Sequence, residues 1–388
     1  MQWLLSLIIL LIFGFLGVIA SDSRVYLSKS PAVSDHKTEE VVSLDDTEEL
    51  GEVKSVVDEE TPLFQTEQTD KTEVILEVTP DAEETEAVVF EEIPSIPEPQ
   101  MPVSFSAINT EVRESLVNIL CTTKFGGSLK PSSGSGVIID ERGVILTNAH
   151  LAQYLLIKDY QVPDFLNCVI RVGSPAKPRY KARLLHISSE WILNNTDNIT
   201  SQNPRGTGED DYALLYITDT VDKNGKLPDK FPTLSFEIER SGILQVGEQV
   251  LTAAYPAGFL GGISIQRDLF ASSAVTAVME LFTFKEGTLD LFSIGGSVVA
   301  QKGASGGAVV DTKSRVVGII VTTSLAETTA ERDLRAITLS HINKSIVEEL
   351  GVELTTLLAG NLENTANIFE LTRAQSLINL LEEELDNS

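Results

Sequence analysis

The feature that most restricts the fold of this chain is a series of short β-rich runs between about Val117 and Thr323. Turns rich in Gly, Pro, Asn and Asp separate the runs, and no long helical pattern lies between them. Beside a strand at Val117–Thr122, the runs are SGVIID, GVILTN, NCVIRV, YKARLLHI, YALLYI, EQVLTAAY, FASSAVTAVM, LFSIGG, GGAVVD and VVGIIVTT. Because parallel sheets need a helix between successive strands, the pattern predicts an all-β fold of antiparallel barrels or a sandwich. Roughly 200 residues are enough for two small barrels.

Helical patterns flank the β-rich region. The run AINTEVRESLVNIL predicts a short helix before the first strand, and from Leu334 onward the spacing of apolar residues becomes helical. Near the end of the chain they recur every three or four positions, at Ile368, Leu371, Ala374, Ile378, Leu381 and Leu385. This spacing indicates an amphipathic helix that packs on its own domain or on a second copy of the chain, so a homo-oligomer stays open. We therefore expect a domain over residues 105–333, followed by a helical segment at 334–388.

Two segments precede the expected domain. The run Trp3–Ala20 is apolar apart from Ser6, which predicts that residues 1–21 are a membrane anchor or a signal peptide, the anchor being favoured. Residues 22–104 are strongly acidic and poor in aromatic residues, so we expect a disordered linker. Between Pro31 and Gln100, 22 Asp and Glu stand against 3 Lys, a net charge of −19 out of −28 for the chain. Such a balance argues against nucleic acid as a partner, because phosphates require a basic face.

Only two cysteines occur, Cys121 and Cys168, and both fall in predicted strands. Two are too few for a fold that depends on many disulfides. An exported domain could join them, but two buried free thiols are the favoured interpretation.

The stretch QKGASGGAVVD makes Ser305 the first candidate for chemistry, although it could be a hydroxyl in an ordinary glycine-rich turn. A serine is a good nucleophile only when a base lies within hydrogen-bond reach and a third group orients that base. The base is expected at His150, where the strand GVILTN ends and a turn begins. The acid is expected at Asp210 or Asp211, at the start of the apolar strand YALLYI.

The other three histidines are weaker candidates for the base. His36 lies in the acidic linker, His186 is interpreted as a strand residue, and His341 opens a predicted helix. GASGG also fits the G-x-S-x-G turn of α/β-hydrolases, whose catalytic histidine follows the serine. Only His341 follows Ser305, within a mostly helical segment, so that class of enzyme is disfavoured.

Taken in chain order, TNAH, DYALL and GASGG resemble the trypsin-like serine proteases, most closely those of the HtrA/DegP type. The resemblance covers about residues 106–345. It includes SGSGVIID before the histidine strand, the AAYPAGF turn, and KGASGGAVVD with RVVGIIV behind it. It implies two six-stranded antiparallel β-barrels of trypsin-like type.

The resemblance also assigns roles to residues. It implies Ser305 as nucleophile, His150 as general base and acid, and Asp211 as the group that orients the imidazole. The family places its acid two residues before the Ala that starts the apolar core of the strand, here Ala213, which favours Asp211 over its neighbour. The backbone N–H groups of Gly303 and Ser305 would form the oxyanion hole. No metal ion and no organic cofactor is expected.

Two residues, Ala304 and Val299, and the segment after Ser324 bear on regulation and specificity. Ala304 stands where zymogens of the trypsin type carry Asp and HtrA-type proteins usually Asn, so activation by an ion pair with a new N-terminus is not expected. Val299, six residues before the nucleophile, would lie at the base of the substrate pocket, where an apolar floor favours small or medium aliphatic side chains. The 64 residues after Ser324 are predicted to be helical, so no PDZ domain is expected.

The expected function is a serine endopeptidase that hydrolyses unfolded or flexible proteins through an acyl-enzyme intermediate. The N-terminal run predicts a membrane-anchored chain with an extracytoplasmic protease domain, or a secreted one if the run is cleaved, engaged in protein quality control or processing. Its partners would be protein or peptide substrates and the membrane. The alternative is a catalytically silent trypsin-fold binding module tethered to the membrane.

Overall fold

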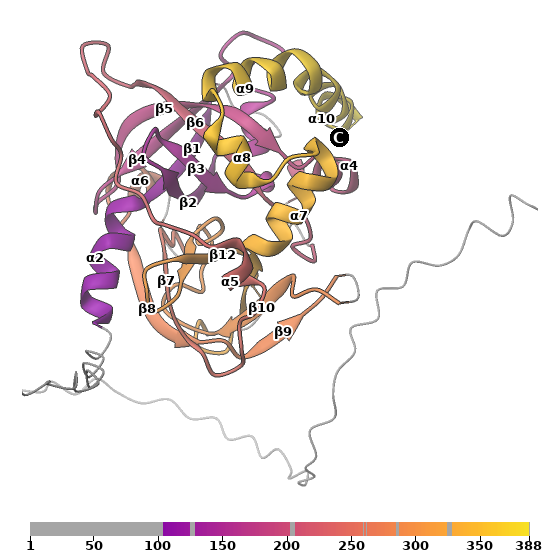
Figure 1. Ribbon diagram of the computed structural model, residues 1–388. Coiled ribbons are helices and arrows are strands. Elements are labelled where there is room, and N and C mark those ends of the chain that lie inside the picture. Colours follow the sequence, from indigo (N-terminus) through magenta and orange to yellow (C-terminus); the bar gives the residue numbers. More distant parts are fainter. Residues whose placement is uncertain are drawn as a thin grey trace, which may run out of the picture. The chain divides into compact units, whose positions relative to one another are not determined.

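A computed structural model of the chain describes residues 104–387, apart from 125–128, 202–205, 259, 261, 285–286 and 324–327 (Figure 1). The predicted membrane segment Trp3–Ala20 and the acidic stretch up to residue 103 lie outside the described residues. Within the described part, no helix has both the length and the apolar character needed to cross a membrane.

The first six strands close into an antiparallel barrel, the upper group of strands in Figure 1. They are β1 (Leu116–Thr123), β2 (Ser132–Asp140), β3 (Val144–Thr147), β4 (Leu166–Val172), β5 (Lys177–Ile187) and β6 (Ala213–Thr220), in the order β1-β2-β3-β6-β5-β4. β2 pairs with β1 from Ser132 to Val137, but β3 ends at Thr147, opposite Gly136 when the register of Val137 and Leu146 is extended. Ser135 therefore keeps one backbone edge that β3 does not cover.

The second half of the domain is a seven-stranded antiparallel sheet. Its strands are β7 (Gln249–Ala254), β8 (Ser272–Ala277), β9 (Glu280–Phe282), β10 (Leu291–Gly295), β11 (Ala308–Val310), β12 (Val316–Thr323) and β13 (Leu334–Thr338), in the order β8-β7-β11-β12-β13-β10-β9. The sheet curls on itself, because the Thr276 hydroxyl in β8 donates to the Ile294 carbonyl in β10 (2.7 Å). The predicted two-barrel, all-β class is confirmed, with a closed barrel and a curled sheet of seven strands in place of two six-stranded barrels.

The prediction of helix from Leu334 onward is wrong for its first five residues. Leu334–Thr338 form β13, which pairs with β10 on one side and β12 on the other. Pairing on both sides outweighs the local helical spacing, since burial and two ladders of hydrogen bonds stabilise the strand more than propensity does. β9 has three residues and an exposed pattern, which leaves no sequence signal for a strand.

Helices fill the connections between strands, and those at the C-terminal end, coloured yellow, lie beside the upper barrel in Figure 1. The α-helices are α2 (Phe105–Ser115), α3 (Ala149–Ala152), α4 (Ser189–Asn194), α5 (Ile238–Ser241), α6 (Gly262–Arg267), α7 (Leu339–Leu350), α8 (Leu354–Ala359), α9 (Leu362–Phe369) and α10 (Gln375–Asn387), with η1 (Gln153–Leu155), η2 (Thr196–Ile199) and the π-helical turn η3 (Glu370–Ala374). α7 packs on β12 and β13, while α9 lies on β5 and α10 on α4 and η2.

The C-terminal helices bury an apolar face against the first barrel, as the default interpretation of their pattern predicted, and the predicted residues Ala374, Leu381 and Leu385 lie on that face. The buried residues are Leu362, Ala366, Phe369, Ala374, Leu377, Leu381 and Leu385. Ile368 and Leu371, predicted for this face, are 51% and 84% exposed. The cause is η3, because a π-turn inserts one residue, so that the buried residues Phe369 and Ala374 are five positions apart instead of three or four.

A disulfide joins Cys121 and Cys168. The two cysteines are direct partners in the register of β1 and β4, and their Cα atoms are 4.0 Å apart. The expectation of two free thiols is therefore wrong, since strand pairing brings together residues that are 47 positions apart.

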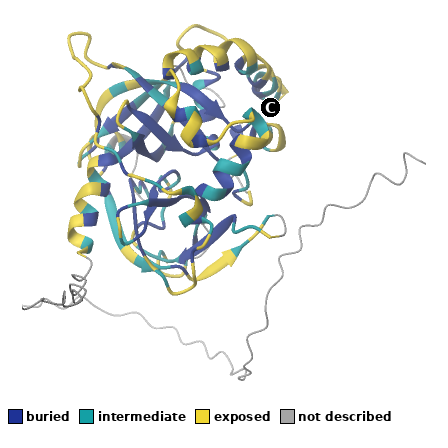
Figure 2. Cartoon of the chain, viewed as in Figure 1, coloured by how far each residue is buried: buried dark blue, intermediate teal, exposed yellow. Residues whose placement is uncertain are grey.

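One apolar cluster runs through both halves of the domain (Figure 2). It contains Leu146 and Leu214 from the first barrel, Ile319 from the second sheet, and Ile342 and Ile346 from α7. Because the halves share a core, the ends of β3, β6 and β11 are held against one another.

Candidate active site

His150 and Asp211 lie together at the ends of two neighbouring strands. β3 ends at Thr147 and the chain turns into α3, which carries His150, while Asp211 precedes β6, the partner of β3. His150 Nδ1 is 2.7 Å from Asp211 Oδ2, and the His150 backbone N–H donates to Oδ1 of the same carboxylate (3.0 Å). Asp211 is buried, whereas a quarter of the His150 side chain is exposed.

This contact decides which nitrogen of His150 can act as a base. A carboxylate accepts hydrogen bonds only, so Nδ1 carries the proton that faces Asp211 and Nε2 keeps its lone pair. The Asn148 side-chain amide donates to the Asp211 carbonyl (2.8 Å), and the Gln153 amide donates to the His150 carbonyl (3.0 Å). These two contacts hold the backbones of His150 and Asp211 in place. Sequence reasoning gave neither Asn148 nor Gln153 a role, although Asn148 stands within the TNAH motif.

Ser305 lies on the loop between β10 and β11, and Ser135 connects that loop to β2. The uncovered backbone edge of Ser135 donates from its N–H to the Ser305 carbonyl (2.7 Å), and its hydroxyl donates to the Gly303 carbonyl (2.8 Å). The same hydroxyl accepts the Tyr255 N–H (2.8 Å), and the Thr147 hydroxyl donates to the Ser135 carbonyl (2.7 Å). Ser135, which is fully buried, therefore ties the serine loop to both halves of the domain.

Two glycines allow this close approach. Gly306 has φ +79°, and a Cβ there would lie 2.0 Å from the Ser135 carbonyl oxygen and 2.7 Å from the Thr147 hydroxyl. Gly303 has φ +92°, and a Cβ there would lie 2.8 Å from the Tyr255 carbonyl oxygen. No side chain fits at either position.

The backbone N–H groups of Gly303 and Ser305 donate no hydrogen bond to any residue that the structure describes. The Lys302 carbonyl accepts the Ala257 N–H (2.6 Å), and the Ala304 carbonyl accepts the Gly307 N–H (2.9 Å). Since N–H and C=O point in opposite directions across a trans peptide, the N–H of Gly303 and that of Ser305 point away from these bonds. Two such donors, one of them the N–H of the serine itself, can stabilise negative charge on a bound oxygen.

The structure brings His150 and Asp211 into hydrogen-bond contact, but it does not place a hydrogen bond between His150 and Ser305. Among the described residues, no hydrogen bond joins Ser305 Oγ to His150 Nε2. Ser305 reaches the histidine strand only through its backbone, by way of Ser135 and Thr147.

The two apolar positions near Ser305 lie in the core of the second sheet. Val299 is fully buried in a cluster with Ala300, Ala304 and Val317, so it presents only apolar atoms to its surroundings. Neither hollow described for this structure includes Val299. Ala304 is buried in the same cluster, where a charged side chain would be desolvated.

Asp210, the alternative acid, faces away from His150. Its Oδ1 lies 3.0 Å from Nε2 of His341, whose Nδ1 lies 3.0 Å from Asp290 Oδ1. Burial alone would lower the pKa of His341, but the hydrogen bonds to the two carboxylates raise it to about 9. Sequence reasoning treated His341 only as the start of a helix and missed this cluster.

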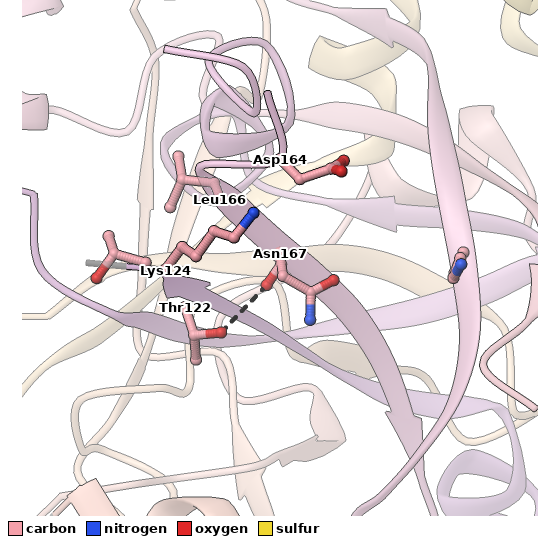
Figure 3. Close-up of a pocket in the computed structure, with 7 residues that line it drawn as sticks. Thr122, Lys124, Asp164, Leu166 and Asn167 are labelled. Atoms are coloured by element: carbon pink, nitrogen blue, oxygen red, sulfur yellow. Dashed lines mark hydrogen bonds between the residues drawn. The ribbon is translucent and has the colours of Figure 1, made fainter. Parts of the chain in front are cut away.

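One hollow of the surface lies apart from His150, Asp211 and Ser305. Figure 3 shows a hollow at the edge of β1 and β4, where the Thr122 hydroxyl donates to the Asn167 carbonyl (3.5 Å) and Lys124 and Asp164 project from the rim. It contains neither His150, Asp211 nor Ser305. Across the described ranges, no group of three or more His, Cys, Asp or Glu side chains is arranged to hold a metal ion.

Comparison with known proteins adds one finding to this geometry. Residues 134–319 match the family of the trypsin-like peptidase domain, a range that begins in β2, ends in β12 and contains His150, Asp211 and Ser305. None of the curated proteins compared with the chain matches it. Together with the barrel-and-sheet architecture, the match shows that the domain has a trypsin-like fold and that residues 134–319 are similar to a trypsin-like peptidase domain.

Proposed function

We propose that the chain is a serine endopeptidase in which Ser305 is the nucleophile, His150 the general base and acid, and Asp211 the group that orients His150. The observation that carries the proposal is the two-point contact of the Asp211 carboxylate with His150, through Nδ1 and the backbone N–H. This contact leaves Nε2 as the proton acceptor of a base that is partly exposed to solvent.

In the acylation step, Ser305 Oγ attacks the carbonyl carbon of the scissile peptide bond and His150 Nε2 takes the hydroxyl proton. The carbonyl oxygen becomes an oxyanion, which accepts from the N–H groups of Gly303 and Ser305; each such donor is worth roughly 3 kcal/mol of barrier. Asp211 stabilises the imidazolium that forms. When the C–N bond breaks, His150 returns its proton to the leaving amine, and an ester to Ser305 remains.

Deacylation repeats the sequence with water in place of the serine hydroxyl. His150 takes a proton from the water, the hydroxide attacks the ester carbonyl, and Ser305 Oγ leaves with the proton from His150. No metal ion or organic cofactor takes part in these steps.

The substrate would be an unfolded or flexible protein segment, as in the HtrA/DegP type that the sequence resembles. The apolar surroundings of Val299 support small or medium aliphatic side chains on the acyl side of the cleaved bond. The Cys121–Cys168 disulfide supports an oxidising compartment, and hence an extracytoplasmic domain that the run Trp3–Ala20 would tether to a membrane. Protein quality control or processing is the role that fits these properties.

A fluorophosphonate probe tests the proposal directly, since it reacts covalently with an activated serine. We expect the wild-type chain to become labelled at Ser305, as identified by peptide mass spectrometry, and to cleave casein. Ser305→Ala should lose both activities while it keeps the wild-type circular dichroism spectrum. Ser297→Ala, which changes a serine near the start of the same loop, is the matched control and should keep both. A wild-type chain that takes no label and cleaves no protein contradicts the proposal.

One observation favours the alternative of a silent binding module. The described structure has no Ser305–His150 hydrogen bond, so the resting site lacks the contact that activates the serine. The two functions differ in one outcome, because a binding module would retain casein or a peptide without cleaving it, and Ser305→Ala would leave that binding unchanged.

A further inference from the structure

His341 holds a buried position between the two halves of the domain. It is the third residue of α7, and its backbone N–H donates to the hydroxyl of Thr338, the helix cap (3.1 Å). The Thr338 backbone N–H donates to the Asp290 carbonyl (2.9 Å), and the Thr338 hydroxyl donates to the Leu289 carbonyl (2.9 Å). His341 and Asp290 therefore share a rigid base at the end of β13.

Both nitrogens of His341 face carboxylates, Asp290 at Nδ1 and Asp210 at Nε2, each at 3.0 Å. A neutral imidazole has one N–H and could donate to only one of them, whereas the imidazolium donates to both ionised carboxylates. Asp290 also accepts the Phe284 N–H (2.7 Å) and the Thr283 hydroxyl (3.1 Å). These bonds hold the Asp290 carboxylate in place. Because His341 binds both carboxylates, Asp290 fixes His341, and His341 in turn fixes Asp210.

Asp210 is the residue next to Asp211, within a tight turn. It has φ +54°, a left-handed conformation that costs free energy for a non-glycine residue, and the Tyr212 N–H donates back to its carbonyl (2.8 Å). One turn further along α7, the Ser345 hydroxyl accepts from the Tyr212 hydroxyl (3.0 Å). Helix α7 thus contacts the residues on both sides of Asp211.

We propose that His341 is a positioning residue, whose imidazolium binds Asp210 and Asp290 and thereby fixes the turn that presents Asp211 to His150. The proposal rests on the proposed peptidase function and extends it to regulation of the same site. Loss of the proton from His341 removes its hydrogen bond to one of the two carboxylates, so the turn relaxes and the rate falls at alkaline pH.

The charges around the cluster agree with a cationic His341. From the loop before β6 it faces Asp210, from the loop before β10 it faces Asp290, and the ring of Phe284 lies edge-on at 5.1 Å. Around Asp210, the side chains of Glu190, Glu209, Glu348 and Glu349 line a hollow. Burial alone would raise the pKa of Asp290, but its hydrogen bonds, led by that from His341, hold it well below the usual range.

The test compares His341→Gln with the wild type in the full-length chain, on a peptide taken from a casein site that the wild type cleaves. We expect kcat to fall about tenfold and KM to change less than twofold, because positioning acts on the chemical step. The wild-type kcat should fall as the pH passes 9, and the rate of His341→Gln should be flat from pH 8 to 10. Lys344→Gln removes a cation from the same helix, an ammonium group that forms no ion pair or hydrogen bond with the described residues, and it should behave as the wild type in both measurements. A His341→Gln variant with wild-type kcat and the same alkaline fall overturns the proposal.

A second measurement does not need turnover. In a Ser305→Ala chain with ¹⁵N-labelled histidine, the proton on His150 Nδ1 reports its hydrogen bond to Asp211. We expect His341→Gln, but not Lys344→Gln, to shift or broaden that resonance. An unchanged resonance in an active enzyme refutes the positioning role and leaves the peptidase standing, whereas a changed resonance in an inactive wild type does the reverse.

If the His341→Gln variant does not fold, measurements on the wild type alone test the proposal. Its alkaline fall in kcat must coincide with the titration of His341 followed by NMR, and a separation between the two transitions overturns the proposal.

Discussion

The serine loop and the acid-bearing turn are held in place by different kinds of interaction. Backbone groups hold Ser305: its carbonyl accepts from Ser135, and the neighbouring carbonyls of Lys302 and Ala304 accept backbone N–H groups. Charged side chains hold the turn before Asp211, where Asp210 binds His341, which binds Asp290 in the other half of the domain. The first arrangement depends on glycine and on close packing, and the second depends on the protonation of one imidazole.

This difference divides the sensitivities of the site. Backbone hydrogen bonds do not titrate, so pH should leave the serine loop unchanged while any added side-chain volume disrupts it. The acid turn should tolerate volume but respond to pH and to loss of charge. The following predictions test the division, and each would weaken it if the two regions responded alike.

Gly306→Ala should have the largest effect. Its Cβ would lie 2.0 Å from the Ser135 carbonyl oxygen, a backbone atom that cannot rotate away. The left-handed conformation costs about 1 kcal/mol and the overpacking up to about 3 kcal/mol more, so urea unfolding should show a loss of about 4 kcal/mol. Cleavage of casein should fall at least about 100-fold. Gly247→Ala is the control, because Gly247 also has positive φ (+87°) but nothing within 4 Å of its Cβ position. Equal losses in the two variants would show that the close approach to Ser135 is not needed.

Alkaline pH should destabilise the acid turn alone. The pKa of His341 is raised to about 9, from an unfolded value of about 6.5, so its contribution is complete below pH 6.5 and is lost as the pH rises through 9. The shift corresponds to at most about 3 kcal/mol of unfolding free energy. Urea unfolding at pH 6.5 and pH 10 should show this loss for the wild type, and His341→Gln should show a smaller one. If the two proteins lose the same amount, the cluster carries no net charge–charge stabilisation.

Ser135→Ala should have a smaller effect, because it removes two hydrogen bonds but no backbone contact. The Tyr255 N–H would lose its acceptor and the Gly303 carbonyl its donor, at a cost of about 2 kcal/mol in unfolding free energy. Since Ser135 binds both Gly303 and Ser305, the two residues whose N–H groups would hold the oxyanion, kcat should fall about tenfold with KM unchanged. Ser133→Ala, two residues earlier on the same face of β2, removes only an acceptor for Asn118 and serves as the control. A rise in KM with constant kcat would assign Ser135 to substrate binding.

The division also explains what the sequence could reveal. The serine loop is local, so GASGG contains the residues and glycines that its geometry needs, and the β-rich runs were enough to predict the all-β class. The assignment of catalytic roles to Ser305, His150 and Asp211 stays a prediction. Contacts between distant residues left no pattern: 131 positions separate Asp210 from His341, and 47 separate the paired cysteines.

Two wrong predictions, one of the buried face of a helix and one of a helix in place of a strand, have the same origin. The π-turn at Glu370–Ala374 shifts the apolar face of the C-terminal helices by one residue, which exposes Leu371. The strand β13 forms at Leu334–Thr338 because β10 and β12 are there to pair with it. Both features follow from packing against elements elsewhere in the chain, which the spacing of residues within one segment does not encode.

The smallest predicted effect concerns His186, which lies beside the acid turn but is held without charge. It is fully buried, and its Nε2 is 3.4 Å from the Tyr212 hydroxyl. Burial, with a smaller contribution from Arg373, lowers the pKa of His186 to about 3, so the imidazole is neutral and its approach to Glu349 is not an ion pair. Because the unfolded chain binds a proton below pH 6.5 and the folded chain does not, the free energy of unfolding should fall by about 1 kcal/mol between pH 6.5 and pH 5.5. His186→Gln should reduce this acid dependence and leave the alkaline one, whereas His341→Gln should do the opposite. If both variants reduced the pH dependence of stability on the same side, acid or alkaline, the two histidines would titrate as one unit. The separate role of His341 at the acid turn would then be contradicted.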